Sequence, residues 1–169
     1  MIMQRTNLVL IGMPASGKSS VGVILAKLIG YDFIDTDILI QRSEKKRLSE
    51  IIREVGVDGF LEVEARVNGS VEADHCVIAT GGSAVYSEEA MRHLKKIGHI
   101  MYLKVDYETI RKRLGNIRQR GVALREGQTL RDLYDERVVL YEKYADTVVE
   151  EKGEVEDVVV AILKLMKRK

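Results

Sequence analysis

Residues 12–20 read GMPASGKSS, and this stretch decides how we expect the chain to fold. An apolar run precedes it at residues 8–11, and a second apolar segment follows at residues 21–29. The stretch fits the pattern G-x-x-x-x-G-K-[ST] in full. Its glycines let backbone N–H groups turn inward around phosphate oxygens, and a following helix presents its positive end to the anion. We therefore predict a nucleotide-binding phosphate loop between a strand and a helix, rather than an ordinary glycine turn.

The side chains of this loop predict how a nucleotide is held. Lys18 would neutralise the β- and γ-phosphates, and the Ser19 hydroxyl would bind Mg²⁺. The loop residues that we expect to bind ATP are Gly12, Ala15, Ser16, Gly17, Lys18, Ser19 and Ser20. The sequence contains no Asn-Lys-x-Asp motif of the kind that GTPases use to recognise the base, and motor or helicase ATPases are normally larger. The class that remains is a small kinase.

Outward from the loop, short apolar runs alternate with longer segments of helical period, which indicates an α/β fold with a parallel sheet. The predicted strands are residues 7–12, 33–35, 77–80, 99–105 and, at an edge of the sheet, 147–149. The predicted helices are residues 18–29, two pieces within 38–55, 87–97, 107–114, 130–141 and 155–166, with a further helical stripe at Phe60, Val63, Val67 and Val71. Gly30 stands in the expected C-cap position of the first helix. We expect residues 1–169 to form a single domain.

Composition excludes several classes of protein. A net charge of +1 argues against a protein that binds duplex nucleic acid. The single cysteine, Cys76, lies in an apolar run, which predicts a packed thiol and no intramolecular disulfide. No apolar stretch reaches the roughly 18 residues of a membrane-spanning helix, and no signal peptide precedes the first strand. We therefore expect a cytoplasmic enzyme or switch.

Two short polar segments follow predicted strands at the carboxyl edge of the sheet, where ligands bind in open parallel sheets. Of Asp35 and Asp37, one carboxylate can serve Mg²⁺ and the other can accept a hydrogen bond from a substrate hydroxyl as general base. The alternative is a turn in which Asp37 caps the next helix, and beside a phosphate loop we favour the functional interpretation. The segment TGGS at residues 80–83 either lets a ligand approach the backbone closely or forms a plain turn.

Charged residues elsewhere add two hypotheses. Arg137 falls on the apolar face of its predicted helix, so it needs an anionic partner. That partner is either a substrate carboxylate or a carboxylate of the chain itself, such as Glu64, which lies on a predicted inward stripe of its own. From these residues alone we favour the ion pair. Residues 115–127 contain three glycines and the arginines Arg118, Arg120 and Arg125, which is typical of a mobile lid that closes on phosphate, the alternative being a solvated basic loop.

Taken together, these motifs resemble the shikimate kinase family over almost the whole chain. The matches follow in order: GMPASGKSS, FIDTD, the Gly-Phe and acidic segment at residues 59–64, ATGGSAV, the arginine-rich loop, and ERVVLYEKYAD. The resemblance implies a three-layer P-loop kinase fold with a five-stranded parallel sheet flanked by helices. It also implies transfer of the ATP γ-phosphate to the 3-hydroxyl of shikimate, a small carboxylated ring.

By position, the resemblance implies a role for individual residues. Lys18 and the loop amides would hold ATP, Arg113 would flank the adenine, and Arg120 or Arg118 would be the arginine of the lid. Asp35 would support the metal with Ser19, and Asp37 would bind and polarise the acceptor hydroxyl. The residues implied to bind the acceptor are Asp37, Gly81, Gly82, Ser83 and Arg137. Lys18, Asp37 and Arg120 would be the catalytic residues.

The chain departs from the family pattern in three places. Leu61 stands where the family has an arginine that also grips the shikimate carboxylate, and Ser83 stands where it has a third glycine. The usual Arg-Pro-Leu-Leu of the lid is Arg-Gly-Val-Ala at residues 120–123. Shikimate is therefore the leading acceptor, and another small hydroxy acid, hydroxy amino acid or sugar acid is the alternative. We expect a monomer that binds ATP, Mg²⁺ and this metabolite, and neither nucleic acid nor membrane.

Overall fold

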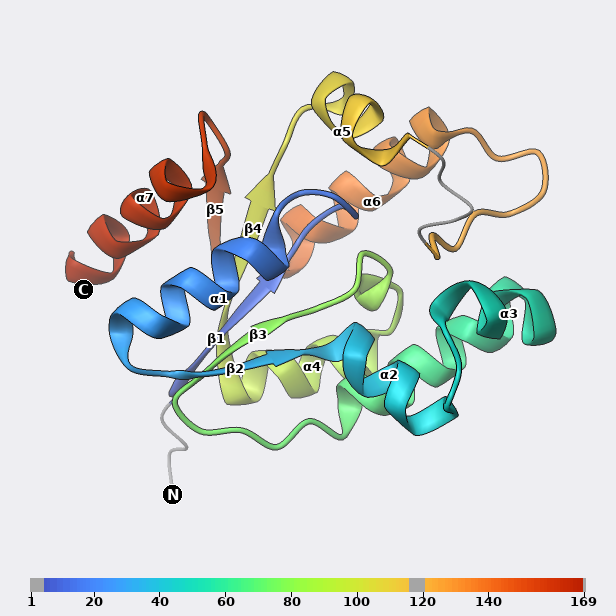
Figure 1. The fold of residues 1–169 in the computed structure, drawn as a ribbon, viewed down its shortest axis with the longest axis horizontal. Coiled ribbons are helices and arrows are strands. Elements are labelled where there is room, and N and C mark those ends of the chain that lie inside the picture. The colour runs from blue at the N-terminus through green and yellow to red at the C-terminus, as the bar shows by residue number, and fades with distance from the viewer. Residues whose placement is uncertain (1–4, 116–120, 169) are drawn as a thin grey trace.

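The computed structural model describes residues 5–115 and 121–168 of the chain. Its centre is a parallel sheet with the strand order β2-β3-β1-β4-β5, in which every neighbouring pair is parallel (Figure 1). The strands are β1 (Asn7–Ile11), β2 (Asp32–Asp35), β3 (Cys76–Ala79), β4 (Gly98–Lys104) and β5 (Thr147–Glu150). The predicted five-stranded parallel sheet is therefore confirmed, with its last strand at an edge.

The middle strand of the sheet, β1, is buried along its whole length. Strands pair with it on both sides, Leu8 lying opposite Val77 of β3 and His99 of β4. Parallel strands covered on both faces are near-continuously apolar, which explains the run Leu8–Ile11. Because all strands point the same way, the segments after β1, β2 and β3 leave the sheet at one edge.

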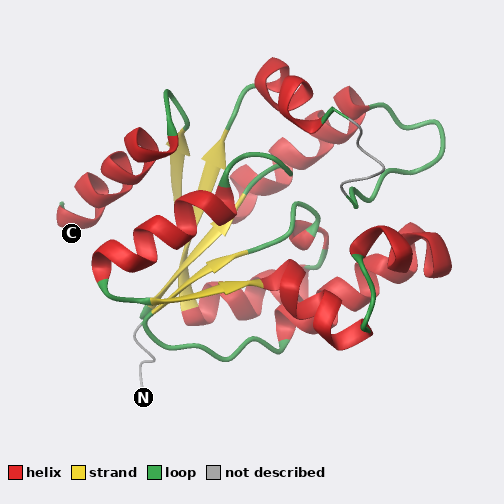
Figure 2. Ribbon diagram, in the orientation of Figure 1, coloured by secondary structure: helices red, strands yellow, loops and turns green. Residues whose placement is uncertain are grey.

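Helices cover both faces of the sheet, as Figure 2 shows. On one face, α1 (Lys18–Ile29) packs against α7 (Val155–Lys167), and their apolar residues meet those of β1, β3 and β4. On the other face lie α4 (Glu88–Ile97) and α6 (Leu130–Tyr144), with α5 (Tyr107–Leu114) beside α6. The result is the helix–sheet–helix layering that the sequence predicts.

Beyond the carboxyl edge of the sheet, α2 (Thr36–Glu44) and α3 (Leu48–Gly69) form a separate helical layer. The sequence predicts two helical pieces and a later helical stripe. In the structure α3 joins the second piece to Phe60, Val63 and Val67 of the stripe, whereas Val71 lies beyond the end of the helix. The join is a kink at Gly56, whose φ of 74° and ψ of 177° are not helical. These helices share an apolar cluster that also receives Ala123 from the loop before α6.

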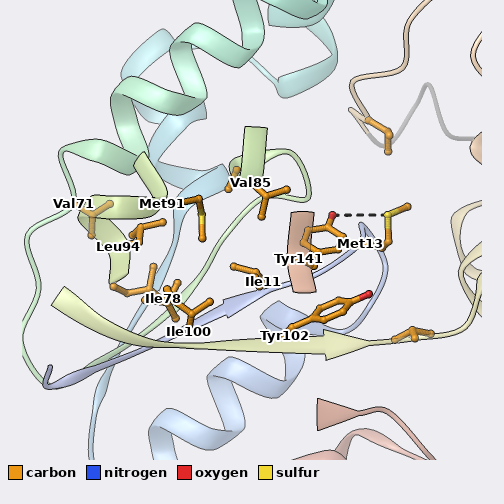
Figure 3. Close-up of a cluster of buried hydrophobic side chains, with 14 of the residues drawn as sticks. Ile11, Met13, Val71, Ile78, Val85, Met91, Leu94, Ile100, Tyr102 and Tyr141 are labelled. Carbon is orange, nitrogen blue, oxygen red and sulfur yellow. Dashed lines mark hydrogen bonds between the residues drawn. The ribbon is translucent and has the colours of Figure 1, made fainter. Parts of the chain in front are cut away.

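The larger apolar cluster lies between the sheet and the α4–α6 layer and extends to the phosphate loop (Figure 3). Near Met13, Tyr102 and Tyr141 pack against each other in a tilted arrangement, with ring centroids 5.0 Å apart. The Tyr141 hydroxyl also lies 3.8 Å from the Met13 sulfur, within weak hydrogen-bonding range. Packing on α6 therefore positions the loop that follows β1.

Two further expectations concern the chain as a whole. Cys76 is a free, buried cysteine, and burial raises the pKa of its thiol to about 11, as expected for a packed and unreactive group. Along residues 5–115 and 121–168, no helix has both the length and the apolar composition needed to cross a bilayer.

Candidate active site at the carboxyl edge of the sheet

The phosphate loop joins β1 to α1 in a strained conformation. Gly12, Ala15 and Gly17 all have positive φ values, of 152°, 63° and 90°. A side chain on Gly12 would place its Cβ 2.8 Å from the carbonyl oxygen of Leu103, so only glycine fits there. Such conformations persist where the surroundings impose them, and they are found at ligand-binding turns.

Lys18 spans this loop from the first turn of α1. Its ammonium group donates hydrogen bonds to the carbonyl oxygens of Gly12 and Met13, both at 2.8 Å, and to Ser16 Oγ at 3.3 Å. Burial lowers the pKa of Lys18 to about 8, and the charges of Asp37 and Asp35 partly oppose that shift. The side chain is therefore a buried cation at neutral pH, held by neutral acceptors that an anion can replace.

Ser19 and Asp35 face each other across the gap between α1 and β2. The Ser19 hydroxyl donates to Asp35 Oδ2 at 2.7 Å. The second oxygen of Asp35 accepts the backbone N–H of Asp37 at 3.0 Å, so Asp35 is the residue that caps α2. The predicted alternative, in which Asp37 caps the helix, is wrong because Asp37 already lies in its first turn.

The pairing of a hydroxyl with a carboxylate fits Mg²⁺. This ion keeps several waters and is usually held by one or two carboxylates together with substrate phosphates. In the described part of the chain, no group of three or more His, Cys, Asp or Glu side chains forms a cation site of its own. A magnesium ion at Ser19 and Asp35 would therefore depend on the nucleotide that binds with it.

Asp37 lines a cavity of about 460 Å³ beside the phosphate loop. The cavity has a size typical of ligand sites. Burial raises the pKa of Asp37 to about 6, the nearby Asp35 charge adds to the shift, and Lys18 opposes it. The structure brings side chains of the loop, α2, α3, the turn after β3, and α6 to this one cavity, namely Lys18, Ser19, Asp37, Glu64, Ser83 and Arg137.

The two glycines after β3 are in close contact with these charged groups. A Cβ on Gly81 would stand 2.5 Å from Glu64 Oε2 and 2.6 Å from Asp37 Oδ1. A Cβ on Gly82 would stand 2.6 Å from Pro14 and 2.9 Å from Arg137 Nη1. Neither position has room for a larger residue, so the glycines let the carboxylates and the guanidinium approach the same turn.

Arg137 is 1% exposed on the inner face of α6. Its Nε donates to the Tyr86 hydroxyl and its Nη2 to the carbonyl oxygen of Ala123, both at 3.3 Å, and its guanidinium lies over the Tyr86 ring. Within residues 5–115 and 121–168 it forms no ion pair with Glu64. The predicted ion pair is therefore wrong, because neutral oxygens hold the guanidinium instead.

Glu64 is equally buried, at 1% exposure, and has a different partner. Its Oε1 accepts a hydrogen bond from Ser83 Oγ at 2.5 Å. Burial raises the pKa of Glu64 to about 7, and the Ser83 hydrogen bond opposes that shift. The sequence placed both residues near the site but gave no sign of their pairing, since they belong to separate elements.

The predicted lid falls only partly on described residues. Arg118 and Arg120 lie outside them. Residues 121–123 line the cavity, whereas Arg125 pairs with Asp58 on α3 at 2.7 Å. The described end of this loop therefore borders the site with apolar side chains.

On the other side of the phosphate loop lies a second cavity of about 470 Å³. Ala15, Gly17 and Ser20 border both cavities, and Ser16 borders the second. Arg113 also lines the second cavity, where it binds Glu151 through both terminal nitrogens and donates to the Ala15 carbonyl oxygen at 3.2 Å. The two cavities offer separate places for a nucleotide and an acceptor on either side of one phosphate loop.

Comparisons with known proteins agree on one family. A family model described as "Shikimate kinase" matches residues 14–167. A shikimate kinase of Clostridium botulinum (strain Loch Maree) is 38% identical over 168 residues, which cover 96% of each chain. The solved shikimate kinase from Acinetobacter baumannii, in complex with shikimate, superposes with a TM-score of 0.87 at 31% identity, over 98% of this chain and 95% of that one. The enzyme from Aquifex aeolicus superposes with a TM-score of 0.80 at 29% identity, over 95% and 96%.

Proposed function

The chain belongs to the shikimate kinase family and is an ATP-dependent kinase, and from this premise we propose that it phosphorylates the 3-hydroxyl of shikimate. One observation carries the proposal: Lys18 of the phosphate loop, the carboxylate of Asp37 and the guanidinium of Arg137 line a single cavity. A phosphate-binding cation, a base and a carboxylate-binding group are what transfer to a small hydroxy acid requires.

On the donor side, the loop from Gly12 to Ser20 would hold the phosphates of ATP, with Arg113 beside the adenine in the second cavity. Ser19 and Asp35 would hold Mg²⁺, which when bound neutralises charge on the β- and γ-phosphate oxygens. The Lys18 ammonium would exchange its loop carbonyl partners for phosphate oxygens. Since these carbonyls are neutral acceptors, a phosphate makes the stronger charge-assisted hydrogen bonds.

On the acceptor side, Asp37 would accept the hydrogen bond of the attacking hydroxyl and take its proton as the bond to phosphorus forms. The pKa of about 6 leaves this carboxylate ionised at neutral pH and still basic enough to act. Arg137 would bind the acceptor carboxylate, and Gly81 and Gly82 would let the acceptor approach the backbone. Lys18 would stabilise negative charge on the transferred group.

The resemblance implies that Arg120, or Arg118, contacts the transferred phosphate from a lid at about residues 115–127. We further propose that the chain acts as a single-domain monomer in the cytoplasm. Sedimentation velocity would test the monomer, and a dimer at assay concentration would contradict it.

A second acceptor class is favoured by Leu61 and Ser83. Leu61 packs half-buried against the α2–α3 apolar cluster, so Arg137 is the arginine that the described part of the cavity presents to an acceptor. A small hydroxy amino acid or sugar acid is the alternative to shikimate on this ground.

An ADP-release assay over a panel of acceptors separates the two. We expect turnover with shikimate to exceed that with quinate, serine, homoserine and glycerate. Turnover with one of these and none with shikimate would contradict the proposed acceptor while keeping the kinase.

A further inference from the structure

We propose that Glu64 is a second acceptor-binding residue, whose free carboxylate oxygen accepts a hydrogen bond from the hydroxyl next to the one that is phosphorylated. The inference deepens the proposed function and rests on it. By binding that hydroxyl, Glu64 selects acceptors that carry two neighbouring hydroxyls.

The two oxygens of Glu64 have different surroundings. Oε1 accepts the Ser83 hydroxyl at 2.5 Å. Oε2 is buried and has no hydrogen-bond partner among the described residues. A buried polar atom without a partner costs free energy, more when its group is charged, so such an atom in a cavity wall calls for a donor from a ligand.

The free oxygen lies close to the proposed base. Glu64 Oε2 and Asp37 Oδ1 both come within 2.6 Å of the point where a Cβ on Gly81 would stand. Two carboxylate oxygens thus lie against the same side of Gly81, and the absence of a side chain there lets both come this close. Hydroxyls on adjacent carbons are close enough together to reach both oxygens at once.

The nearby cations do not satisfy Glu64. Lys18 donates to the loop carbonyls and Ser16, and Arg137 donates to Tyr86 and the Ala123 carbonyl oxygen. At position 61, one turn earlier on α3, the side chain is a leucine packed into an apolar cluster. The donor that Oε2 needs is therefore left to the acceptor molecule.

Ser83 orients the carboxylate of Glu64. By holding Oε1, its hydroxyl fixes the rotation of the carboxylate and leaves Oε2 facing Gly81. Glu64 is ionised above its pKa of about 7 and then accepts hydrogen bonds through both oxygens.

The test combines an enzyme variant with an acceptor analogue. Above the pKa of Glu64, the wild type should show a kcat/KM for shikimate about ten- to hundredfold above that for 4-deoxyshikimate, which lacks only the neighbouring hydroxyl. Glu64→Gln places an amide where Oε2 stood, so the ratio should fall towards one. The ratio is measured within each variant, so a change in the folded fraction cancels.

Three controls sharpen the result. Glu62→Gln makes the same change on the exposed side of α3 and should keep the wild-type ratio. 5-Deoxyshikimate lacks the more distant hydroxyl, and its ratio to shikimate should be the same in the wild type and in Glu64→Gln. Glu64→Asp keeps the charge but shortens the side chain, and it gives the same lowered ratio for 4-deoxyshikimate if the amide variant does not fold.

A wild-type ratio near one, or an unchanged ratio in Glu64→Gln, would overturn the inference while leaving shikimate kinase activity in place. A wild type that does not phosphorylate shikimate at all would instead contradict the proposed function, and the inference with it.

Discussion

At the scale of single residues, Lys18 is the side chain on which phosphate binding most depends. It is the buried cation of the phosphate loop, and its present partners are carbonyl oxygens and a hydroxyl. Lys18→Ala should lower kcat by at least about a hundredfold, since it removes charge stabilisation from the transferred group. Lys27→Ala, an exposed lysine on the same helix, should leave kcat unchanged. Steady-state ADP release measures both, and a normal kcat in Lys18→Ala would contradict the assigned role.

The pKa values of Asp37 and Lys18 predict the pH dependence of activity. Glu64 must be ionised to bind the neighbouring hydroxyl and Asp37 must lose its proton to act as base, so kcat/KM should begin to fall below pH about 7 and fall more steeply below about 6. Lys18 must keep its proton, so kcat/KM should fall again as pH rises above about 8. A bell-shaped profile between these values is expected, and its limits belong to the coupled groups together. Because pH 4.5 lies about 1.5 units below the pKa of Asp37, a profile that stays flat down to that pH would exclude Asp37 as the base.

Replacing Arg137 tests whether this residue binds the acceptor or only supports the fold. Its guanidinium is buried, and its hydrogen bonds go to neutral oxygens. Arg137→Ala should raise the KM of the acceptor roughly ten- to hundredfold and that of ATP much less, because a charge-assisted hydrogen bond is lost. Arg131→Ala, exposed on the same helix, is the matched control. An unchanged acceptor KM with lower thermal stability would show that Arg137 supports the fold alone.

At the scale of elements, the kink in α3 sets where Glu64 lies. Gly56 has a φ of 74° and a ψ of 177°, a conformation that is essentially restricted to glycine. Gly56→Ala should therefore destabilise the protein by about 1–3 kcal/mol. Gly69→Ala, where φ is not in the left-handed region and no atom lies within 4 Å of the new Cβ, should cost nothing measurable. Urea unfolding compares the two, and equal stabilities would show that the kink is not imposed by the fold.

Sequence patterns predicted most of the elements at this scale. The bounds of α1 and α5 agree with the prediction, because apolar residues at helical spacing and, for α1, a terminal glycine define them locally. The kinked helix α3 was predicted only in pieces. The helical spacing of apolar residues is interrupted at Gly56, where the non-helical backbone changes the direction of the helix. Only the packing of α3 against α2 and α4 shows that the two pieces belong to one element.

At the scale of the whole molecule, the buried carboxylates of the site lower the free energy of unfolding when they are ionised. Burial raises the pKa of Asp37 from 3.8 to about 6. As pH rises from 4 towards 6 the unfolded chain loses this proton first, so the folded state loses stability, and the loss then stays constant at higher pH. Asp37→Asn should therefore be more stable than the wild type at neutral pH, on the order of 1–3 kcal/mol, while losing activity.

Unfolding at two pH values checks the sign of this effect. The difference between Asp37→Asn and the wild type should shrink towards zero near pH 4, where Asp37 is largely protonated in the folded state. A variant less stable than the wild type at neutral pH would show that Asp37 stabilises the fold through Lys18, contrary to the expected balance.

The sequence by itself determined the phosphate loop, the alternation of strands and helices, and the family. These rest on local spacing: a loop pattern of eight residues and apolar periods that each element carries within itself. It also placed Asp37 and the glycine turn at one edge, since parallel strands end together, whereas Arg137 was assigned to the site only through the resemblance to the family.

Only the tertiary structure decided how the buried charges are paired. Arg137 and Glu64 each lie on an apolar stripe, and from the sequence an ion pair between them is the simplest solution. In the folded chain Arg137 instead donates hydrogen bonds to the Tyr86 hydroxyl and the Ala123 carbonyl oxygen, and Glu64 accepts one from Ser83. Contacts between α3, α6 and the turn after β3 are fixed by the packing of elements far apart in the chain, because a side chain's partner depends on distances that no local pattern encodes.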